Sequence, residues 1–93
     1  MNPIVALDER VEVVALFEKT KTGRCPCTPY KMRRAGQAQD VVFTIFGMHH
    51  PTVQGKRMIH VFEMSDGSND YRLEFDAEAL VWRLTAILEG GHA

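Results

Sequence analysis

The sequence predicts a mainly β protein, built as a small antiparallel sheet or a partly open barrel of five or six strands. Three observations support this fold class. Short apolar segments recur along the chain, β-branched and aromatic residues are concentrated in them, and Gly, Pro, Asn and Asp separate them. We expect a single domain, residues 1–93, because a chain of this length has room for one core.

The first strand is predicted in the segment ERVEVVALFEK, residues 9–19. An extended chain places Val11, Val13, Ala15 and Phe17 on one side, although the apolar residues between them interrupt the alternation. A helix is the alternative for this segment. The β-branched content favours the strand.

A loop, TKTGRCPCTP, is predicted in residues 20–29 because Gly and two Pro residues break the chain there. The next segment, residues 30–47, is predicted to form a hairpin that turns at Ala35-Gly36. Its return strand, Val41 to Phe46, is almost entirely apolar, as in a strand that is covered on both faces.

The segment HHPTVQGK, residues 49–56, is predicted to be the following connection, with the two adjacent histidines at the corner of a hairpin. Residues 57–64, RMIHVFEM, then return as a strand. SDGSND, residues 65–70, contains an Asp-Gly pair that indicates a hairpin turn. In residues 71–75, YRLEF, apolar and charged side chains alternate without exception, which predicts another strand.

The segment DAEALVWRLTAILEGG, residues 76–91, fits both a helix and a strand. As a helix it begins at an Asp76 cap and stops at Gly90. As a strand it places Leu80, Trp82 and Leu84 on one face. A C-terminal helix would make the domain α+β. Local signals alone slightly favour the helix, and the strand is the alternative.

The segments CTPYKMR, HHP, HVFEMSDG and YRLEFDAEALVWRL, in this order, resemble a group of short bacterial proteins of unassigned function. The resemblance covers about residues 28–85. Similar F-D-x-E-x-L-x-W-x-L stretches form hairpins, so the resemblance implies a strand in the last segment. It implies no catalytic residue.

Charge is distributed unevenly along the chain. Residues 19–57 contain eight Lys and Arg residues against one acid, whereas the rest contains three Arg residues against eleven acids. This asymmetry suggests an anionic partner for the middle segment, and an accessory nucleic-acid-binding role is our alternative hypothesis. Against it, the sequence pI of about 6.4 is low for a dedicated nucleic-acid binder. The residues that would contact phosphates are Lys31, Arg33, Arg34, Lys56 and Arg57.

Apolar residues are more numerous than one face of a small sheet needs. We therefore predict a second apolar face that another protein or a second copy of the chain would cover, giving a homodimer. The proposed interaction face comprises Val42, Phe46, Ile59 and Val61, with Val81 beside them. A protein-interaction module that self-associates is accordingly the favoured function.

No catalytic or metal centre is predicted. Cys25 and Cys27 are one residue apart, which is closer than the usual C-x2-C knuckle of a zinc site. His49 and His50, the other candidate ligands, would point to opposite faces of an extended strand. No nucleophile elbow or phosphate-binding loop occurs, so we expect neither an enzyme nor a cofactor. The absence of a signal peptide and of a disulfide framework leads us to expect a cytoplasmic protein without a membrane span.

Overall fold

The computed structural model describes residues 4–18 and 25–90, and in them seven antiparallel strands form one curled sheet that resembles half a barrel. The strands are β1 (Ile4–Leu16), β2 (Thr28–Arg33), β3 (Val41–Val42), β4 (Ile45–Gln54), β5 (Arg57–Ser65), β6 (Asp70–Asp76) and β7 (Val81–Leu88). Their order in the sheet is β3-β2-β1-β7-β6-β5-β4, so β3 and β4 are the two edges. The predicted mainly β fold is confirmed.

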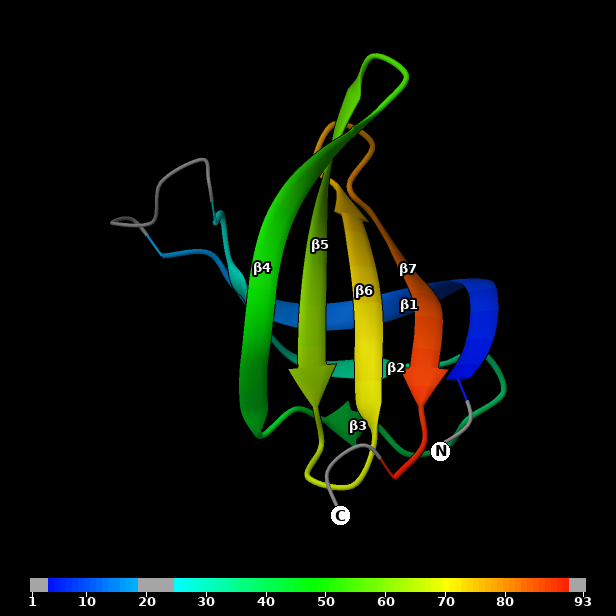
Figure 1. The fold of residues 1–93 in the computed structure, drawn as a ribbon. Coiled ribbons are helices and arrows are strands. Elements are labelled where there is room, and N and C mark those ends of the chain that lie inside the picture. Colours follow the sequence, from blue (N-terminus) through cyan, green and yellow to red (C-terminus); the bar gives the residue numbers. More distant parts are fainter. Residues whose placement is uncertain (1–3, 19–24, 91–93) are drawn as a thin grey trace.

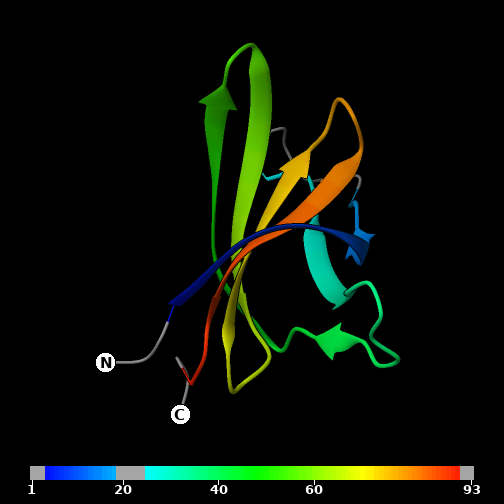
Figure 2. The same cartoon turned by 90° about the vertical axis from the view of Figure 1, so that its right-hand side faces the viewer.

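The sheet curls because β1 belongs to both of its layers. Strands β4 to β7 stand side by side, while β1 and β2 cross behind them, and the view turned by 90° shows the two layers apart (Figures 1 and 2). The first part of β1 pairs with β7, and its last part, from Glu12 to Leu16, pairs with β2. A bulge between Ala6 and Glu9 bends the strand, as extra residues in a ladder do.

The structure has more strands than the five or six predicted, because the expected return strand Val41 to Phe46 is divided. The amides of Phe43 and Thr44 donate to two different strands, to the carbonyl of Tyr30 on β2 and that of Ser65 on β5, each at 2.8 Å. The chain therefore passes from one layer to the other at this point.

The last segment is strand β7, so the helical alternative is wrong. Trp82 and Leu84 both lie in the core, two residues apart, as the period of a strand requires. The ring of Trp82 stacks on that of Phe75 on β6, with 4.4 Å between ring centroids. An extended chain paired with β6 can make this cross-strand contact. Its packing energy exceeds the local preference of the segment for a helix.

The prediction that the adjacent histidines form a hairpin corner is also wrong. His49, His50 and Pro51 lie inside β4, and the turn between β4 and β5 falls at Gly55 and Lys56. Proline has no N–H to donate, and a strand tolerates it where one side has no neighbour. Since β4 is an edge strand, Pro51 does not end it.

The core lies between the two layers. Phe62, Leu73 and Leu84, on three neighbouring strands, are completely buried. The remaining buried residues of this cluster come from every layer of the fold: Val11, Cys27, Met32, Phe43, Met64, Tyr71, Phe75, Trp82 and Ile87. We call the face of β4–β7 that carries these residues the core side, and the opposite face the outer side.

Candidate interaction surface

Strand β4 is an accessible sheet edge with no charged residue. Eight of its ten residues, IFGMHHPTVQ, are exposed, and none is Asp, Glu, Lys or Arg. Among residues 4–18 and 25–90, no strand lies beside its outer edge. Natural proteins commonly protect such edges with charged side chains, since the free backbone groups of an edge can pair with another chain. In β4 that protection is missing.

Large apolar side chains are exposed along this edge on both sides of the sheet. Phe46 lies on the core side, where its ring meets Phe62 edge-on at 6.2 Å, yet 42% of Phe46 is exposed. Val53 and its cross-strand partner Met58 are 64% and 49% exposed. We call the exposed apolar set the β4 rim: Ile45, Phe46, Met48, Val53 and Met58.

Two features of β4 limit its contacts. Pro51 removes one backbone donor from the strand. A bulge lies between Phe46 and Met48, where Gly47 approaches the backbone of Glu63. Both features bend or interrupt the edge locally, but neither places a charge on it.

Two histidines connect β4 to β5 on the core side. Nε2 of His49 lies 3.0 Å from Nδ1 of His60, and the two rings are stacked with an interplanar angle of 20°. The His49 ring also packs on Phe62 at 4.8 Å. His60 is 6% exposed, and this burial lowers the pKa of its imidazole.

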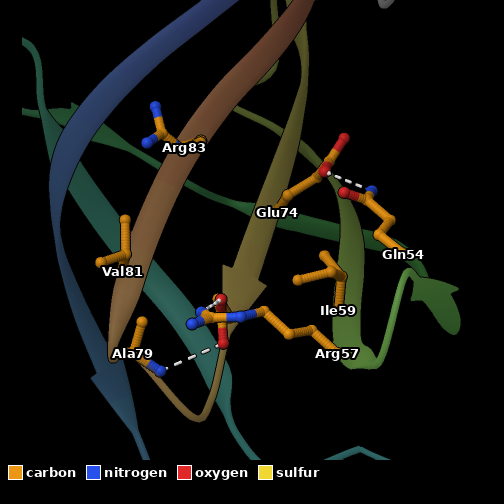
Figure 3. A pocket seen from close by; sticks show the side chains of 8 residues that line it. Gln54, Arg57, Ile59, Glu74, Ala79, Val81 and Arg83 are labelled. Atoms are coloured by element: carbon orange, nitrogen blue, oxygen red, sulfur yellow. Dashed lines mark hydrogen bonds and ion pairs between the residues drawn. The ribbon is translucent and has the colours of Figure 1, made fainter.

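The outer side of the sheet carries a depression of about 250 Å³ between β4 and β7 (Figure 3). Ile59 and Val81 are its apolar lining. Polar and charged side chains surround them, and the complete lining is Gln54, Arg57, Ile59, Glu74, Asp76, Ala79, Val81 and Arg83.

The charged groups of this depression bind one another. Arg57 donates to Asp76, and Gln54 donates to Glu74 at 3.1 Å. The amide of Ala79 and the Arg57 guanidinium hold the pKa of the Asp76 carboxyl below its usual value. Arg83 donates to Asp8 on β1 at 3.1 Å. Because these groups are satisfied within the chain, we interpret the depression as part of a cross-strand charge lattice.

The four residues of the predicted interaction face do not form one face. Ile59 and Val61 point to the outer side, where they are only 7% and 5% exposed. Phe46 points to the core side of β4, and Val42 lies on β3 at the other edge of the sheet. Ile59 and Val61 are therefore covered within the chain, whereas Met58 of the same strand is 49% exposed.

The five predicted phosphate-binding residues are likewise not gathered on one surface. Lys56 and Arg57 lie at the turn between β4 and β5, at the top of Figure 1, whereas Lys31 and Arg33 lie on β2 in the layer behind. Arg34 follows β2.

Four of these five cations are bound to carboxylates. Lys31 and Arg33 both pair with Asp40, at 3.4 and 2.8 Å. Arg34 binds both carboxylate oxygens of Glu9, at 3.0 and 2.9 Å, and Arg57 pairs with Asp76. Asp40, Glu9 and Asp76 together offset three of these five positive charges. Lys19, Lys21 and Arg24 of the same segment lie outside the described residues.

The metal-ligand candidates are placed as follows. Cys27 is fully buried, Cys25 is half-buried, and neither forms a disulfide. His49 lies on the core side, whereas His50, its neighbour on the strand, points to the outer side opposite Val61. Within residues 4–18 and 25–90, no three His, Cys, Asp or Glu side chains are grouped as a metal site would require.

Sequence reasoning missed Met48, Val53 and Met58 as surface residues. The histidine pair and the proline predict a connection where the structure has the second half of β4. The signal that identifies the edge is the run of fifteen residues without a formal charge, residues 41–55, between Asp40 and Lys56.

In the part of the chain that the structure describes, no helix is long and apolar enough to cross a membrane. Comparisons with protein-family models, with curated proteins and with solved structures found no match to this chain.

Proposed function

We propose that the protein is a non-catalytic interaction module that self-associates through β4, the partner being a second copy of the same chain. The observation that carries the proposal is the exposed edge of β4, ten residues long and free of formal charge. An added strand would satisfy the free backbone groups of the edge, and the β4 rim would supply apolar contact.

A second copy suits this edge because the contact would be self-complementary. In a two-fold symmetric dimer the same strand from each copy lies antiparallel to the other, and the β4 edges of both copies are then occupied. Like charges placed opposite one another destabilise such a pair of strands. At neutral pH β4 contributes no formal charge to its own copy, so self-pairing carries no such repulsion.

The exposed apolar side chains of the β4 rim also support the proposal that β4 pairs with a second copy. Met48 is 55% exposed on the outer side and Val53 is 64% exposed. Pairing with a second β4 would cover part of both side chains. Each Å² of apolar surface removed from water contributes about 25 cal/mol, so covering several such residues offsets part of the entropy lost on association.

The experiment is light scattering after size-exclusion chromatography over about 10 to 200 µM protein, since association depends on concentration. We expect the wild-type chain to reach twice its mass of 10.5 kDa. Met48→Lys should give the monomer, because a lysine on an edge strand opposes pairing. Val14→Lys is the matched control: Val14 is also 55% exposed but lies on β1, away from the edge.

A wild-type chain that is monomeric over this whole range contradicts the proposal. A Met48→Lys chain that still dimerises while folded, as judged by far-ultraviolet circular dichroism, shows that another surface is used. A Val14→Lys chain that loses the dimer as completely as Met48→Lys would also exclude β4 as the specific contact.

A further inference from the structure

Two exposed apolar residues lie near opposite ends of β4 and on the same side of the sheet. Phe46 lies on the core side, because its ring meets the buried ring of Phe62 edge-on at 6.2 Å. Val53 is paired with Met58 of β5. Met58 is four residues from Phe62 on the same strand, so strand alternation places Met58, and with it Val53, on the core side as well.

The bulge at Gly47 is the reason that both residues share one side. Phe46 and Val53 are seven residues apart, and in a regular strand they would point to opposite sides. Gly47 is the extra residue of the bulge, so the other nine residues of β4 each have a partner on β5. Phe46 is the second of these nine paired positions and Val53 is the eighth, so both are equally far from the middle.

We infer that two copies pair along the full length of β4, so that Phe46 of each copy packs against Val53 and Met58 of the other. In a two-fold symmetric antiparallel pair, full overlap places the second position of one strand opposite the eighth of its partner. The contact therefore occurs twice in each dimer. This inference rests on the proposed function, and it adds the register of the two strands and the side chains that hold them together.

Full overlap also matches the two sides of the sheet. Core-side residues of one copy then lie opposite core-side residues of the other, whereas a slip by one position would set them against outer-side residues. A slip by two positions moves Phe46 away from Val53, to a place opposite Pro51 or opposite the turn that follows β4. Either slip leaves fewer positions paired than full overlap does.

Apolar surface is available on both partners of the core-side contact. Phe46 is 42% exposed, and Val53 and Met58 are 64% and 49% exposed. Removing such surface from water favours association, and Phe and Met are enriched at protein interfaces. The Phe46 ring already rests on Phe62, which is completely buried. A side chain that is ordered before binding loses less conformational entropy when the partner arrives.

The outer side of β4 offers a less apolar contact in the same register. Ile45 is the first of the nine positions and Met48 is the third, so they would lie opposite Gln54 and Thr52 of the other copy. Both of these partners are polar. The core side is therefore the side on which apolar residues meet apolar residues across the pair.

Disulfide trapping tests the register. In the double variant Phe46→Cys/Val53→Cys, cysteines of different copies lie directly opposite, at the Cα separation of about 4.5 to 5.5 Å that a disulfide accepts. Mild oxidation with copper phenanthroline should therefore give a covalent dimer of twice 10.5 kDa on non-reducing electrophoresis. The control Met48→Cys/Val53→Cys places its cysteines on opposite sides of the sheet. It should give no more covalent dimer than the wild-type chain, which contains Cys25 and Cys27.

The dimer dissociation constant, measured by sedimentation velocity, tests the contact itself. Phe46→Ala should raise the constant at least about tenfold, which corresponds to about 1.4 kcal/mol. Val53→Ala should raise it too, and it decides the test if Phe46→Ala does not fold, because Val53 is mostly exposed. Met48→Ala is the matched control: Met48 is 55% exposed but would face Thr52, so its loss should matter less. Fluorescence of the buried Trp82 checks the fold of each variant.

The outcomes separate the two proposals. A wild-type chain that stays monomeric removes the proposed function and the register with it. A wild-type dimer that is not trapped by Phe46→Cys/Val53→Cys above the control keeps the function but overturns the register. The register is also overturned if Met48→Ala weakens the dimer more than the folded variants of Phe46 and Val53 do.

Discussion

Gly47 on β4 lies directly against the backbone of Glu63 on β5: a Cβ placed on Gly47 would be 2.7 Å from the Glu63 carbonyl oxygen. Real Cβ atoms essentially never approach a backbone oxygen so closely. Glycine at this position thus allows β4 to pass close to β5 at the bulge and to continue as the edge of the sheet.

The substitution Gly47→Ala should destabilise the protein by about 2 to 3 kcal/mol, because the strand must move away from Glu63 to admit the methyl group. The measurement is urea unfolding. Gly36→Ala is a useful comparison, since a Cβ at Gly36 meets no atom within 4 Å and only its φ of +77° opposes the change. A smaller loss for Gly47→Ala than for Gly36→Ala would contradict this account of the bulge.

Leu80 should be replaceable with a gain in stability. It has a φ of +58°, in the left-handed region, and its side chain is 73% exposed. The left-handed conformation costs a residue such as leucine about 1 to 2 kcal/mol, and asparagine tolerates it better. We expect Leu80→Asn to raise the melting temperature by about 4 to 8 °C.

Differential scanning calorimetry measures this gain in melting temperature. The control is Ala79→Asn, because the neighbouring residue Ala79 does not have a positive φ. An unchanged or lower melting temperature for Leu80→Asn would mean that the leucine side chain stabilises the turn.

Val61 and Val53 should respond in opposite ways to the same substitution. Val61 is 5% exposed on the outer side, so Val61→Glu buries a carboxylate without a partner and should cost about 3 to 5 kcal/mol, enough to unfold much of the protein. Val53 is 64% exposed, and Val53→Glu should leave the free energy of unfolding within about 0.5 kcal/mol. Denaturant titrations at low protein concentration compare the two. Equal losses would show that Val53 is more covered than its exposure indicates.

His60 should make the fold less stable in mild acid. Burial lowers its pKa below the value of about 6.5 for an exposed histidine. The unfolded chain then binds a proton at a pH where the native ring stays neutral. Above about pH 6.5 His60 is neutral in both states and does not reduce the free energy of unfolding. As the pH drops toward the lowered pKa, the free energy of unfolding falls by at most about 1.4 kcal/mol per pH unit.

Urea unfolding of His60→Leu, measured between about pH 7.5 and about pH 5, should show a shallower dependence than the wild type. A dependence as steep as that of the wild type would assign the effect to another group.

Local sequence pattern determined a large part of the fold. Tyr71, Leu73 and Phe75 alternate with polar residues because a strand with one buried face requires a period of two, and they form β6 as predicted. The turn before it was also predictable. Asp66 and Gly67 mark it because Gly67 adopts a φ of +98° and the Asp66 carboxylate accepts from nearby backbone amides.

The candidate site was less predictable, because it depends on which strands are neighbours. A proline ends a strand at the centre of a sheet but is tolerated at its edge, and nothing local to HHP identifies β4 as an edge. The sheet order, in which β1 pairs with β7 from the other end of the chain, decides this. The contact between His49 and His60 follows from the same order.

The electrostatics were decided in the same way. The residue content of the middle segment sets how many charges it carries, and that number indicates a basic surface. Only the tertiary structure brings Glu9 to Arg34, 25 residues away, and Asp76 to Arg57, 19 residues away. Strand periodicity and turn chemistry depend on residues close together in the sequence, so they can be predicted from it. Pairing between distant strands determines which charges are neutralised and which edge remains open, and this pairing is known only from the tertiary structure.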